Sequence, residues 1–475
     1  MTPRGRGAAL LALILASCGQ ARAHLTPARP ARARGPLRVS AVNPRYFADD
    51  SGHVVYLTGS HTWSSLQDNG PSDPPPAFDY AAYLDTLMAY NHNFFRLYAW
   101  EQSRWTDETA GDYWITPLPW TRTGPGLALD GKLRWNLTRF DPEYFARLRD
   151  RVAAAGRRGI YVSVMLFNGW SIEGKGDKTL NDPWRGHPFN AANNVNGIDG
   201  HLDPLPQGAA THSLLLPRVL AIQEAYVRHV IDAVDDLDNV LYEISNESDP
   251  ASLAWQDHLV EFIHAYEHTK PKQHPVGITA MWPGGSNGAL FASAADWVSP
   301  GDSGGYATDP PPGNGHPVVI LDTDHLGTEH THESWVWKAF LRGLNPIFMD
   351  SYDGKAIGLG ARPDFDPTLD QYVQVRRAMG YTLTFATKLP LGAMTPQTTR
   401  ASTQYCLADT VSGTYLVYLP EGGSVTVRLA ATSRPLAVQW FAPAHNALTA
   451  GDSITGGGER RFTAPFRGDA VLYIH

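Results

Sequence analysis

The sequence predicts an α/β protein in which a (β/α)8 barrel, or TIM barrel, is followed by a small antiparallel β-sandwich. Between residues 41 and 390, short β-rich runs alternate with helical segments, and eight such runs can be counted. No G-x-G-x-x-G loop or P-loop follows any of these runs, which disfavours an open, doubly wound sheet. Over residues 391–475 the helical periodicity is lost, and short alternating runs lie between turns rich in Gly, Pro and Asp.

The barrel elements can be placed one after another. Asp141 followed by Pro142 provides an N-cap and a proline at the first helical position, and Gly156 follows the end of that helix. The predicted strands are 54–58, 94–98, 160–166, 240–244, 276–280, 297–299, 318–321 and 346–349. The predicted helices are 79–89, 141–155, 217–234, 253–266, 334–342 and 369–385. Two long inserts, 100–140 and 167–216, follow strand ends, where a barrel places its active-site loops.

The C-terminal region has a different sequence pattern from the barrel. Its predicted strands are 415–419, 424–428, 438–441 and 470–473, and no concentrated set of acids, bases or metal ligands accompanies them. Because these strands are strongly hydrophobic, we expect this domain to support the barrel through a packed interface.

Composition excludes several classes of protein. Of 475 residues, 43% are hydrophobic and 18% charged, which indicates a globular chain and excludes disorder and collagen-like repeats. The net charge of −8, without a sustained basic run, predicts no nucleic-acid partner. Two cysteines exclude a disulfide scaffold and a cysteine-based zinc site. The oligomeric state is not indicated.

The N-terminus has the pattern of an export signal. Arg4 and Arg6 precede an apolar run over residues 8–16, and we assign residues 1–23 as a signal peptide and 24–40 as a linker. The run ends at Leu15-Ala-Ser-Cys18, which resembles the lipobox of bacterial lipoproteins and implies a lipid anchor at Cys18. Ordinary cleavage after Ala23 is the alternative. We therefore expect a bacterial exported protein, either an outer-membrane lipoprotein or a periplasmic or extracellular one.

Carboxylates at strand ends are the main candidates for chemistry. Glu243 and Glu247 share one face of the fourth predicted strand by their period of two, and Asp322 and Asp324 share a face at the end of the seventh. The fourth and seventh strands lie nearly opposite each other in an eight-stranded barrel. Two facing carboxyl groups, one protonated and one ionised, are what glycoside hydrolysis requires. We expect Glu243 itself to be a buried, paired residue.

The segment Asn246-Glu247 resembles the Asn-Glu signature of clan A glycoside hydrolases. This resemblance implies that Glu247 is the acid/base, that Asn246 binds a sugar 2-hydroxyl, and that Arg96 orients the nucleophile. More narrowly, residues 43–50 and 57–63 resemble the opening of apiosidase-like and cellulase-like barrel proteins. Residues 416–420 and 439–443 resemble the collagen-binding type of β domain that often follows those barrels.

The sequence departs from the clan at the nucleophile. The clan usually has Glu at the end of strand seven, whereas counting from Pro317 reaches Asp322, with Asp324 two residues later. Which aspartate acts stays open. A carboxyl separation of about 5–5.5 Å predicts retention of configuration and one of roughly 6.5–9.5 Å predicts inversion. The resemblance favours retention.

Aromatic and polar residues at the other strand ends are candidates for substrate binding, because indole faces stack on sugars and polar side chains bind hydroxyls. They are His61, Trp63, Trp100, Asn168, Trp170, Trp282, Asp302, His325, Asp350 and Tyr352. Each of the tryptophans could instead belong to the core, and Arg96 could sit in a structural ion pair.

The resulting hypothesis is a secreted glycoside hydrolase that cleaves O-glycosidic bonds of a plant or microbial polysaccharide or oligosaccharide without a cofactor. A non-catalytic glycan-binding barrel is one alternative. A metal-dependent barrel hydrolase is another, suggested by a cluster at residues 325–333, namely His325, Glu329, His330, His332 and Glu333. No metal site is predicted, since this segment lacks a helical H-E-x-x-H pattern.

Overall fold

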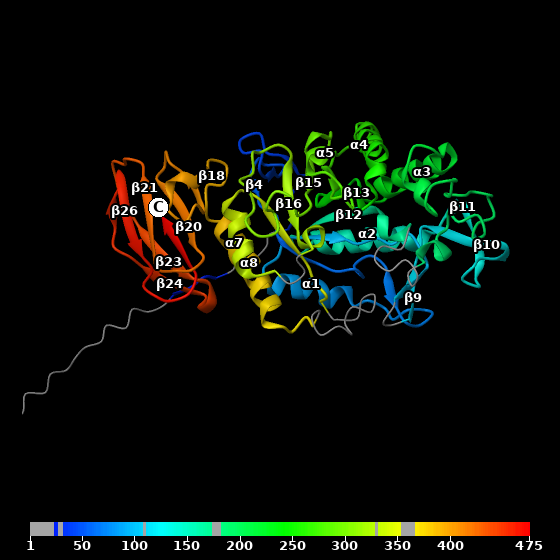
Figure 1. Ribbon diagram of the computed structural model, residues 1–475, viewed down its shortest axis with the longest axis horizontal. Helices are drawn as coiled ribbons and strands as arrows, with labels where there is room; N and C mark the ends of the chain where they lie inside the picture. The colour runs from blue at the N-terminus through cyan, green and yellow to red at the C-terminus, as the bar shows by residue number, and fades with distance from the viewer. Residues whose placement is uncertain (1–22, 27–31, 108–110, 173–181, 328–330, 353–365) are drawn as a thin grey trace, which may run out of the picture.

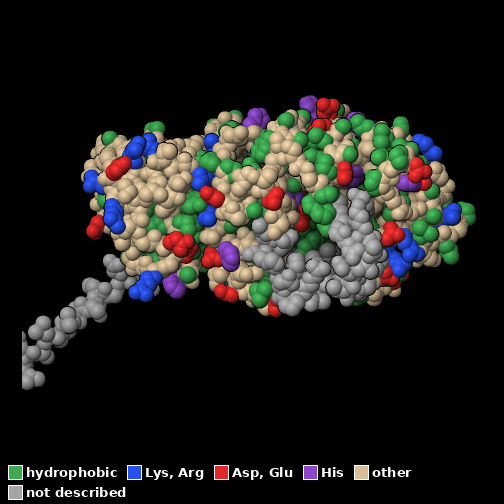
Figure 2. All heavy atoms as spheres, viewed as in Figure 1, with side chains coloured by type: hydrophobic (Ala, Val, Ile, Leu, Met, Phe, Trp, Pro, Cys, Tyr) green, Lys and Arg blue, Asp and Glu red, His purple; other side chains and the backbone are tan. Residues whose placement is uncertain are grey.

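The computed structural model describes residues 23–26, 32–107, 111–172, 182–327, 331–352 and 366–475. Most of the predicted signal peptide, including Cys18, lies outside these ranges. Among the described residues no helix is both long and apolar enough to cross a bilayer. On the face in Figure 2, Lys and Arg side chains are scattered among Asp and Glu side chains, without a continuous basic surface.

Eight parallel strands form the predicted barrel (Figure 1). In chain order they are β5 (Gly59–His61), β7 (Phe94–Leu97), β12 (Tyr161–Asn168), β13 (Val240–Asn246), β14 (Val276–Thr279), β15 (Trp297–Ser299), β16 (Val318–Asp322) and β17 (Asn345–Met349). Each strand pairs with the next, and β17 pairs with β5. At the remaining seam, the Asn93 N–H donates to the carbonyl of Thr58 at 3.1 Å, and the Thr58 N–H donates to Asn93 Oδ1 at 3.0 Å. These bonds bring β5 and β7 together.

Helices follow the strands as predicted, with two additions. They are α1 (Tyr80–Ala89), α2 (Pro142–Gly156), α3 (Pro217–Val234), α4 (Leu253–Glu267), α5 (Asn287–Ala292), α6 (Thr323–Leu326), α7 (Glu333–Leu341) and α8 (Asp370–Ala386). The Asp141 carboxylate accepts from the Glu143 N–H, which confirms the predicted cap of α2. The short helices α5 and α6 were not predicted, because too few residues are involved to show helical periodicity.

The first predicted barrel strand, Val54–Thr58, was wrong. Val54–Val55 forms β4, which pairs with β3 (Phe47–Ala48) in an antiparallel sheet that also contains β2 (Arg38–Val39). The barrel strand begins later, at Gly59. A Cβ atom on Gly59 would lie 2.2 Å from the carbonyl oxygen of Phe94, so the close approach of β5 to β7 requires glycine. A glycine lowers strand propensity, which hid this strand in the sequence.

The insert 100–140, predicted as an active-site loop, contains regular structure. Strands β8 (Arg104–Asp107) and β9 (Gly111–Thr116) form a small sheet with β6 (Asp68–Gly70). Strands β10 (Trp120–Leu127) and β11 (Leu133–Phe140) form a hairpin at the end of the molecule opposite the C-terminal domain (Figure 1).

The C-terminal domain is antiparallel, as predicted. Its main sheet has the order β1-β24-β23-β27-β20-β19-β18, and the pairs β21–β26 and β22–β25 complete it. The bounds are β1 (Ala23–His24), β18 (Thr395–Pro396), β19 (Cys406–Asp409), β20 (Thr414–Leu419), β21 (Ser424–Leu429), β22 (Pro435–Leu436), β23 (Val438–Ala442), β24 (Ala447–Ala450), β25 (Ile454–Thr455), β26 (Gly458–Thr463) and β27 (Ala470–Ile474). Its own core includes Val417, Val427 and Leu472.

The described residues of the predicted linker, 24–40, are anchored rather than free. His24 pairs with Ala447 of β24, and the side chains of Leu25 and Leu37 are buried. These two leucines give the segment apolar contacts that its Ala-, Arg- and Pro-rich composition did not reveal. The assignment of this stretch as a simple tether is therefore incorrect for the part that the structure describes.

The two domains share a packed aromatic interface, in which α7 and α8 lie between the barrel and the β domain (Figure 1). Trp337 of α7 stacks on Tyr418 of β20 with ring centroids 5.9 Å apart. Phe441 of β23 contacts Phe385 of α8 at 5.6 Å. Phe441 and Tyr418 belong to the same buried cluster as the barrel core. The β domain thus buttresses the barrel.

We expect Phe441→Ala to lower the free energy of unfolding by about 3–5 kcal/mol, because it leaves a cavity at this interface. The urea midpoint, followed by tryptophan fluorescence, measures this loss. Val411→Ala is the control, since Val411 is 93% exposed and its loss should cost less than about 0.5 kcal/mol. A midpoint for Phe441→Ala equal to that of Val411→Ala would show that the interface does not stabilise the protein.

Candidate active site

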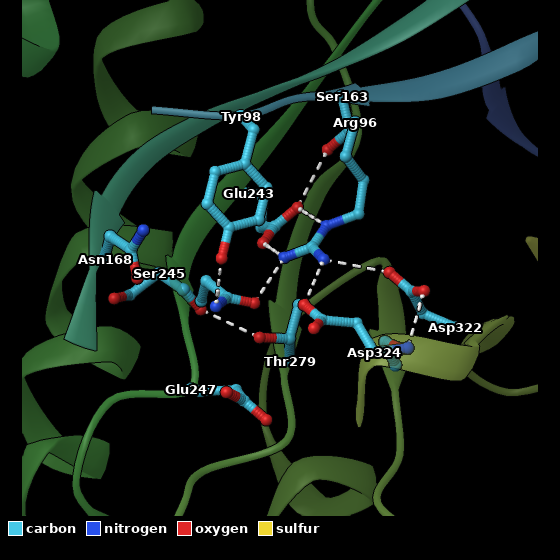
Figure 3. Close-up of polar contacts among 12 residues, drawn as sticks. Arg96, Tyr98, Ser163, Asn168, Glu243, Ser245, Glu247, Thr279, Asp322 and Asp324 are labelled. Atoms are coloured by element: carbon cyan, nitrogen blue, oxygen red, sulfur yellow. Dashed lines mark hydrogen bonds and ion pairs between the residues drawn. The ribbon is translucent and has the colours of Figure 1, made fainter. Parts of the chain in front are cut away.

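The guanidinium group of Arg96 lies at the centre of the barrel mouth and joins three carboxylates (Figure 3). Arg96 comes from β7 and is 1% exposed. Its Nε donates to Glu243 Oε2 at 2.9 Å, and its Nη1 donates to Asp322 at 2.9 Å and to Asp324 at 3.1 Å. Glu243 is thus the buried, paired residue that the sequence predicted. Three segments far apart in the chain meet at this one side chain.

The Asp322 carboxylate accepts hydrogen bonds from three groups of the protein. Its side chain is fully buried, and it accepts from His61 Nε2 at 2.9 Å, from Arg96, and from the backbone N–H of Asp324 at 3.1 Å. The last bond caps the short helix α6. Burial alone would raise the pKa of Asp322, but His61 and Arg96 outweigh burial and hold that pKa well below its ordinary value. Asp322 is therefore ionised, with its oxygens directed at protein donors.

Asp324 has a different environment. It stands in the first turn of α6, its side chain is 13% exposed, and one oxygen accepts from Arg96 Nη1. Figure 3 shows Asp324 between the guanidinium of Arg96 and Glu247, with Asp322 to one side. Asp324 thus combines an arginine partner with access to the mouth.

Glu247 follows the end of β13 and is 8% exposed. Its backbone has φ of 45°, a left-handed conformation that costs a non-glycine residue of the order of 1–2 kcal/mol. The indole N–H of Trp170 donates to the Glu247 carboxylate. Strain of this kind persists where the surrounding structure fixes a side chain for a function.

A row of indole rings lies beside Glu247. Trp170 stacks on Trp282 with centroids 5.6 Å apart and an interplanar angle of 6°, and Trp105 stacks on Trp170 at 5.9 Å. Trp282 is 39% exposed, so its face can receive a sugar. Trp105 was not singled out from the sequence, because its place in an insert gave no strand end to locate it.

Asn246 and His325 are two further polar residues beside Arg96. Asn246 Oδ1 accepts from Arg96 Nη2 at 2.7 Å and pairs with His325 Nε2 at 3.0 Å, while its Nδ2 donates to the Tyr98 hydroxyl at 2.9 Å. His325 also contacts Ser299 Oγ at 2.6 Å. Burial, together with the Arg96 charge, lowers the pKa of His325 to about 3, so this ring is neutral at ordinary pH.

A second buried group, which sequence analysis missed, supports the turn after β13. Glu101 accepts from His212 Nε2 at 3.0 Å and from the backbone N–H of Asn168 at 2.8 Å. His212 Nδ1 lies 3.0 Å from Ser248 Oγ, next to Glu247 in the chain. Burial opposes ionisation of Glu101, but His212 and His187 lower its pKa to about 2. The spacing of these residues in sequence carries no signal that they meet.

Other predicted residues have partners of their own around this cluster. Trp63 and Trp100 are buried, and the Trp100 indole donates to the Trp63 carbonyl at 2.9 Å. Asp350 is buried against Arg376, with the Arg376 Nε donating at 2.7 Å. Tyr352 lies among rings, 5.1 Å from Tyr83. Asp302 is exposed. Trp63, Trp100 and Asp350 are buried in the fold, and their contact with a sugar stays a prediction.

A metal site needs donor atoms that are not already committed. Among the described residues, ligand atoms of Asp322, Asp324 and His325 lie within 4.8 Å of one another. However, Arg96 already contacts both carboxylates, and His325 is engaged by Ser299 and Asn246. Glu329 and His330, from the cluster noted in the sequence, lie outside the described residues.

Comparisons with known proteins agree with the fold. Residues 96–282 match the model of a domain of unknown function, DUF6298, and residues 390–474 match a "Putative collagen-binding domain of a collagenase". A glycoside hydrolase family 5 protein from Bacteroides vulgatus is 11% identical, with 93% of each chain covered and a TM-score of 0.54. A "putative glycoside hydrolase" from the same organism is 14% identical, with 93% of this chain and 82% of the other covered and a TM-score of 0.60. No curated protein matches the sequence. The chain therefore has the TIM-barrel and β-domain fold of these hydrolases.

Asp322→Asn should destabilise the protein by about 3–5 kcal/mol at pH 7, because it leaves Arg96 and His61 with a buried neutral partner. The folded-state pKa of Asp322 is depressed, so its stabilising contribution is present above the ordinary carboxyl pKa and declines as pH falls toward the folded value. Urea unfolding at several pH values should show the difference from the native protein narrowing below pH of about 4. Asp302→Asn, at an exposed site, is the control. A difference that is independent of pH would contradict the ionised pairing of Asp322.

Proposed function

We propose that this protein is a glycoside hydrolase that cleaves O-glycosidic bonds, with Glu247 as acid/base and Asp324 as nucleophile. The observation that carries the proposal is the arrangement at the barrel mouth. Asp324, which accepts from Arg96 and has access to the mouth, lies toward Glu247. The backbone of Glu247 is strained, and its carboxylate accepts from the Trp170 indole N–H. Two carboxyl groups in different surroundings are what this chemistry needs.

The division of roles follows from the contacts of each carboxylate. Arg96 stabilises Asp324 in its ionised form, as a nucleophile requires. Asp322 has the same arginine but is sealed from the mouth, and we assign it to positioning Arg96 and the helix that carries Asp324. Glu247, held by Trp170 next to the exposed face of Trp282, is placed to protonate a leaving oxygen.

Carbohydrate recognition is assigned to the indole row. A sugar on the Trp282 face would lie beside Trp170 and hence beside the Glu247 carboxylate. Asn246 is fully buried and bonded to Arg96, His325 and Tyr98, which supports a role in holding the site. Its binding of a sugar hydroxyl, implied by the clan resemblance, stays a prediction. We propose a plant or microbial polysaccharide or oligosaccharide as substrate and retention of configuration as the outcome.

We further propose that the protein is exported by its N-terminal segment and that Cys18 carries a lipid. The charged-then-apolar order before Cys18 supports this proposal.

Glu247→Gln should reduce kcat for oligosaccharide hydrolysis at least 1000-fold, because the amide cannot give a proton to the leaving group and take one from water. Release of reducing sugar from a panel of plant and microbial glycans measures the activity, and circular dichroism checks the fold. Glu261→Gln, at an exposed position of α4, is the matched control. Equal activity of native protein and Glu247→Gln on a hydrolysed glycan would reject the assignment.

Asp324→Ala should also lower kcat at least 1000-fold, and added azide should restore turnover, because the small anion can occupy the space of the missing carboxylate. In a retaining enzyme the recovered product is a glycosyl azide of inverted configuration, which NMR identifies. Rescue of an Asp322→Ala variant instead would transfer the nucleophile to Asp322. An Asp324→Ala variant with native activity would remove Asp324 from the reaction.

A further inference from the structure

A cavity of about 350 Å³ lies next to the turn that carries Glu247. Its walls come from the start of the 3-10 helix Gly169–Ser171, from the segment around residues 205–215, and from the beginning of α4. This volume falls within the range of small-ligand sites, roughly 300–1000 Å³. None of the candidate site residues described above explains it.

The cavity wall touches the backbone of Glu247. A Cβ atom on Gly169, which lines the cavity, would lie 2.4 Å from the Glu247 carbonyl oxygen. His212, another lining residue, contacts Ser248, the next residue after Glu247, at 3.0 Å. Because the general acid protonates the leaving-group oxygen, the leaving group departs on the Glu247 side. The cavity therefore adjoins the segment that carries the general acid.

The lining has few polar side chains, and they have bonds within the protein; the exposed Asp249 carboxylate accepts from the Ala251 N–H at 2.8 Å. Both nitrogens of His212 are engaged, by Glu101 at 3.0 Å and by Ser248 at 3.0 Å. Ser213 donates to a backbone carbonyl at 2.7 Å, and Ser252 accepts from a glutamine side chain at 2.9 Å. A sugar placed here would lose water without gaining replacement hydrogen bonds, which is unfavourable. An apolar group has no such cost.

Leucines at the rim support the same conclusion. Leu214 is 44% exposed and Leu215 57% exposed, and both line the cavity together with Leu205 and Pro206. Neighbouring exposed apolar side chains around a concave site often mark a binding surface. We propose that this cavity binds the apolar aglycone of the substrate, so that the preferred substrates are glycosides of alkyl or aryl alcohols. This inference rests on the proposed glycosidase activity and changes the leaving group of its substrate from a sugar to an apolar alcohol.

The test compares two glycosides of the same sugar, with octyl and methyl leaving groups. Both release alcohols of similar acidity, so a difference in kcat/KM reports binding of the octyl chain. We expect native protein to prefer the octyl glycoside at least tenfold. Ala254→Phe, at an exposed lining position of α4, should abolish this preference and leave the methyl glycoside unaffected. Ala265→Phe, exposed near the other end of the same helix, should behave as the native protein.

The results distinguish failure of the aglycone site from failure of the proposed function. Hydrolysis of both glycosides at equal kcat/KM by native protein overturns the aglycone site and leaves the proposed function intact. Absence of hydrolysis on every glycoside removes both, even if 2-naphthol alone binds saturably in a fluorescence titration. Saturable 2-naphthol binding that Ala254→Phe abolishes, together with the octyl preference, supports the site. A concentration-dependent dimer that Leu215→Ser dissociates would assign the leucines to a second copy of the chain and overturn the proposal.

Discussion

The structure of the barrel mouth depends on one buried arginine. Arg96 contacts Glu243, Asp322 and Asp324, and His61 is a further partner of Asp322. Removing such a cation from a low-dielectric site would leave uncompensated buried charges, which costs several kcal/mol. The arginine therefore fixes the relative positions of β7, β13 and β16. It also donates to two aspartates that stand two residues apart in the chain.

This constraint explains why the two aspartates differ although they stand two residues apart. The carboxylate oxygens of Asp322 accept from His61, from Arg96 and from the backbone N–H that caps α6, so Asp322 has a structural role. The short helix that it caps turns Asp324 toward the mouth. On the opposite side, the strained backbone at Glu247 and the Trp170 indole hold a third carboxylate toward the same space. Differences in exposure and in hydrogen-bond partners thus give Asp322 a structural role and Asp324 a place in the mouth.

The sequence predicted most of the fold, because the central strands are continuous apolar runs and helix α2 has a clear cap. Asp141 with Pro142 marked α2, and the bounds of α3 agree with those predicted. The first barrel strand was misplaced because Gly59 interrupts its pattern, and the packing of Leu25 and Leu37 was hidden in a stretch that resembles a tether. For the site, period-two spacing placed Glu243 on the face of β13 that meets Arg96, and counting along the seventh strand placed Asp322 at its end. It could not distinguish buried tryptophans such as Trp100 from exposed ones such as Trp282, since exposure depends on contacts between distant segments.

The most direct test of the central claim is to trap the covalent intermediate. A 2-deoxy-2-fluoro glycoside of the sugar that the protein hydrolyses, carrying a good leaving group, should inactivate it, because the fluorine slows breakdown of the glycosyl–enzyme. Peptide mass mapping then identifies the modified carboxylate. We expect one label, on Asp324. A label on Asp322, or turnover of the sugar by an inverting reaction that leaves no label, would contradict it.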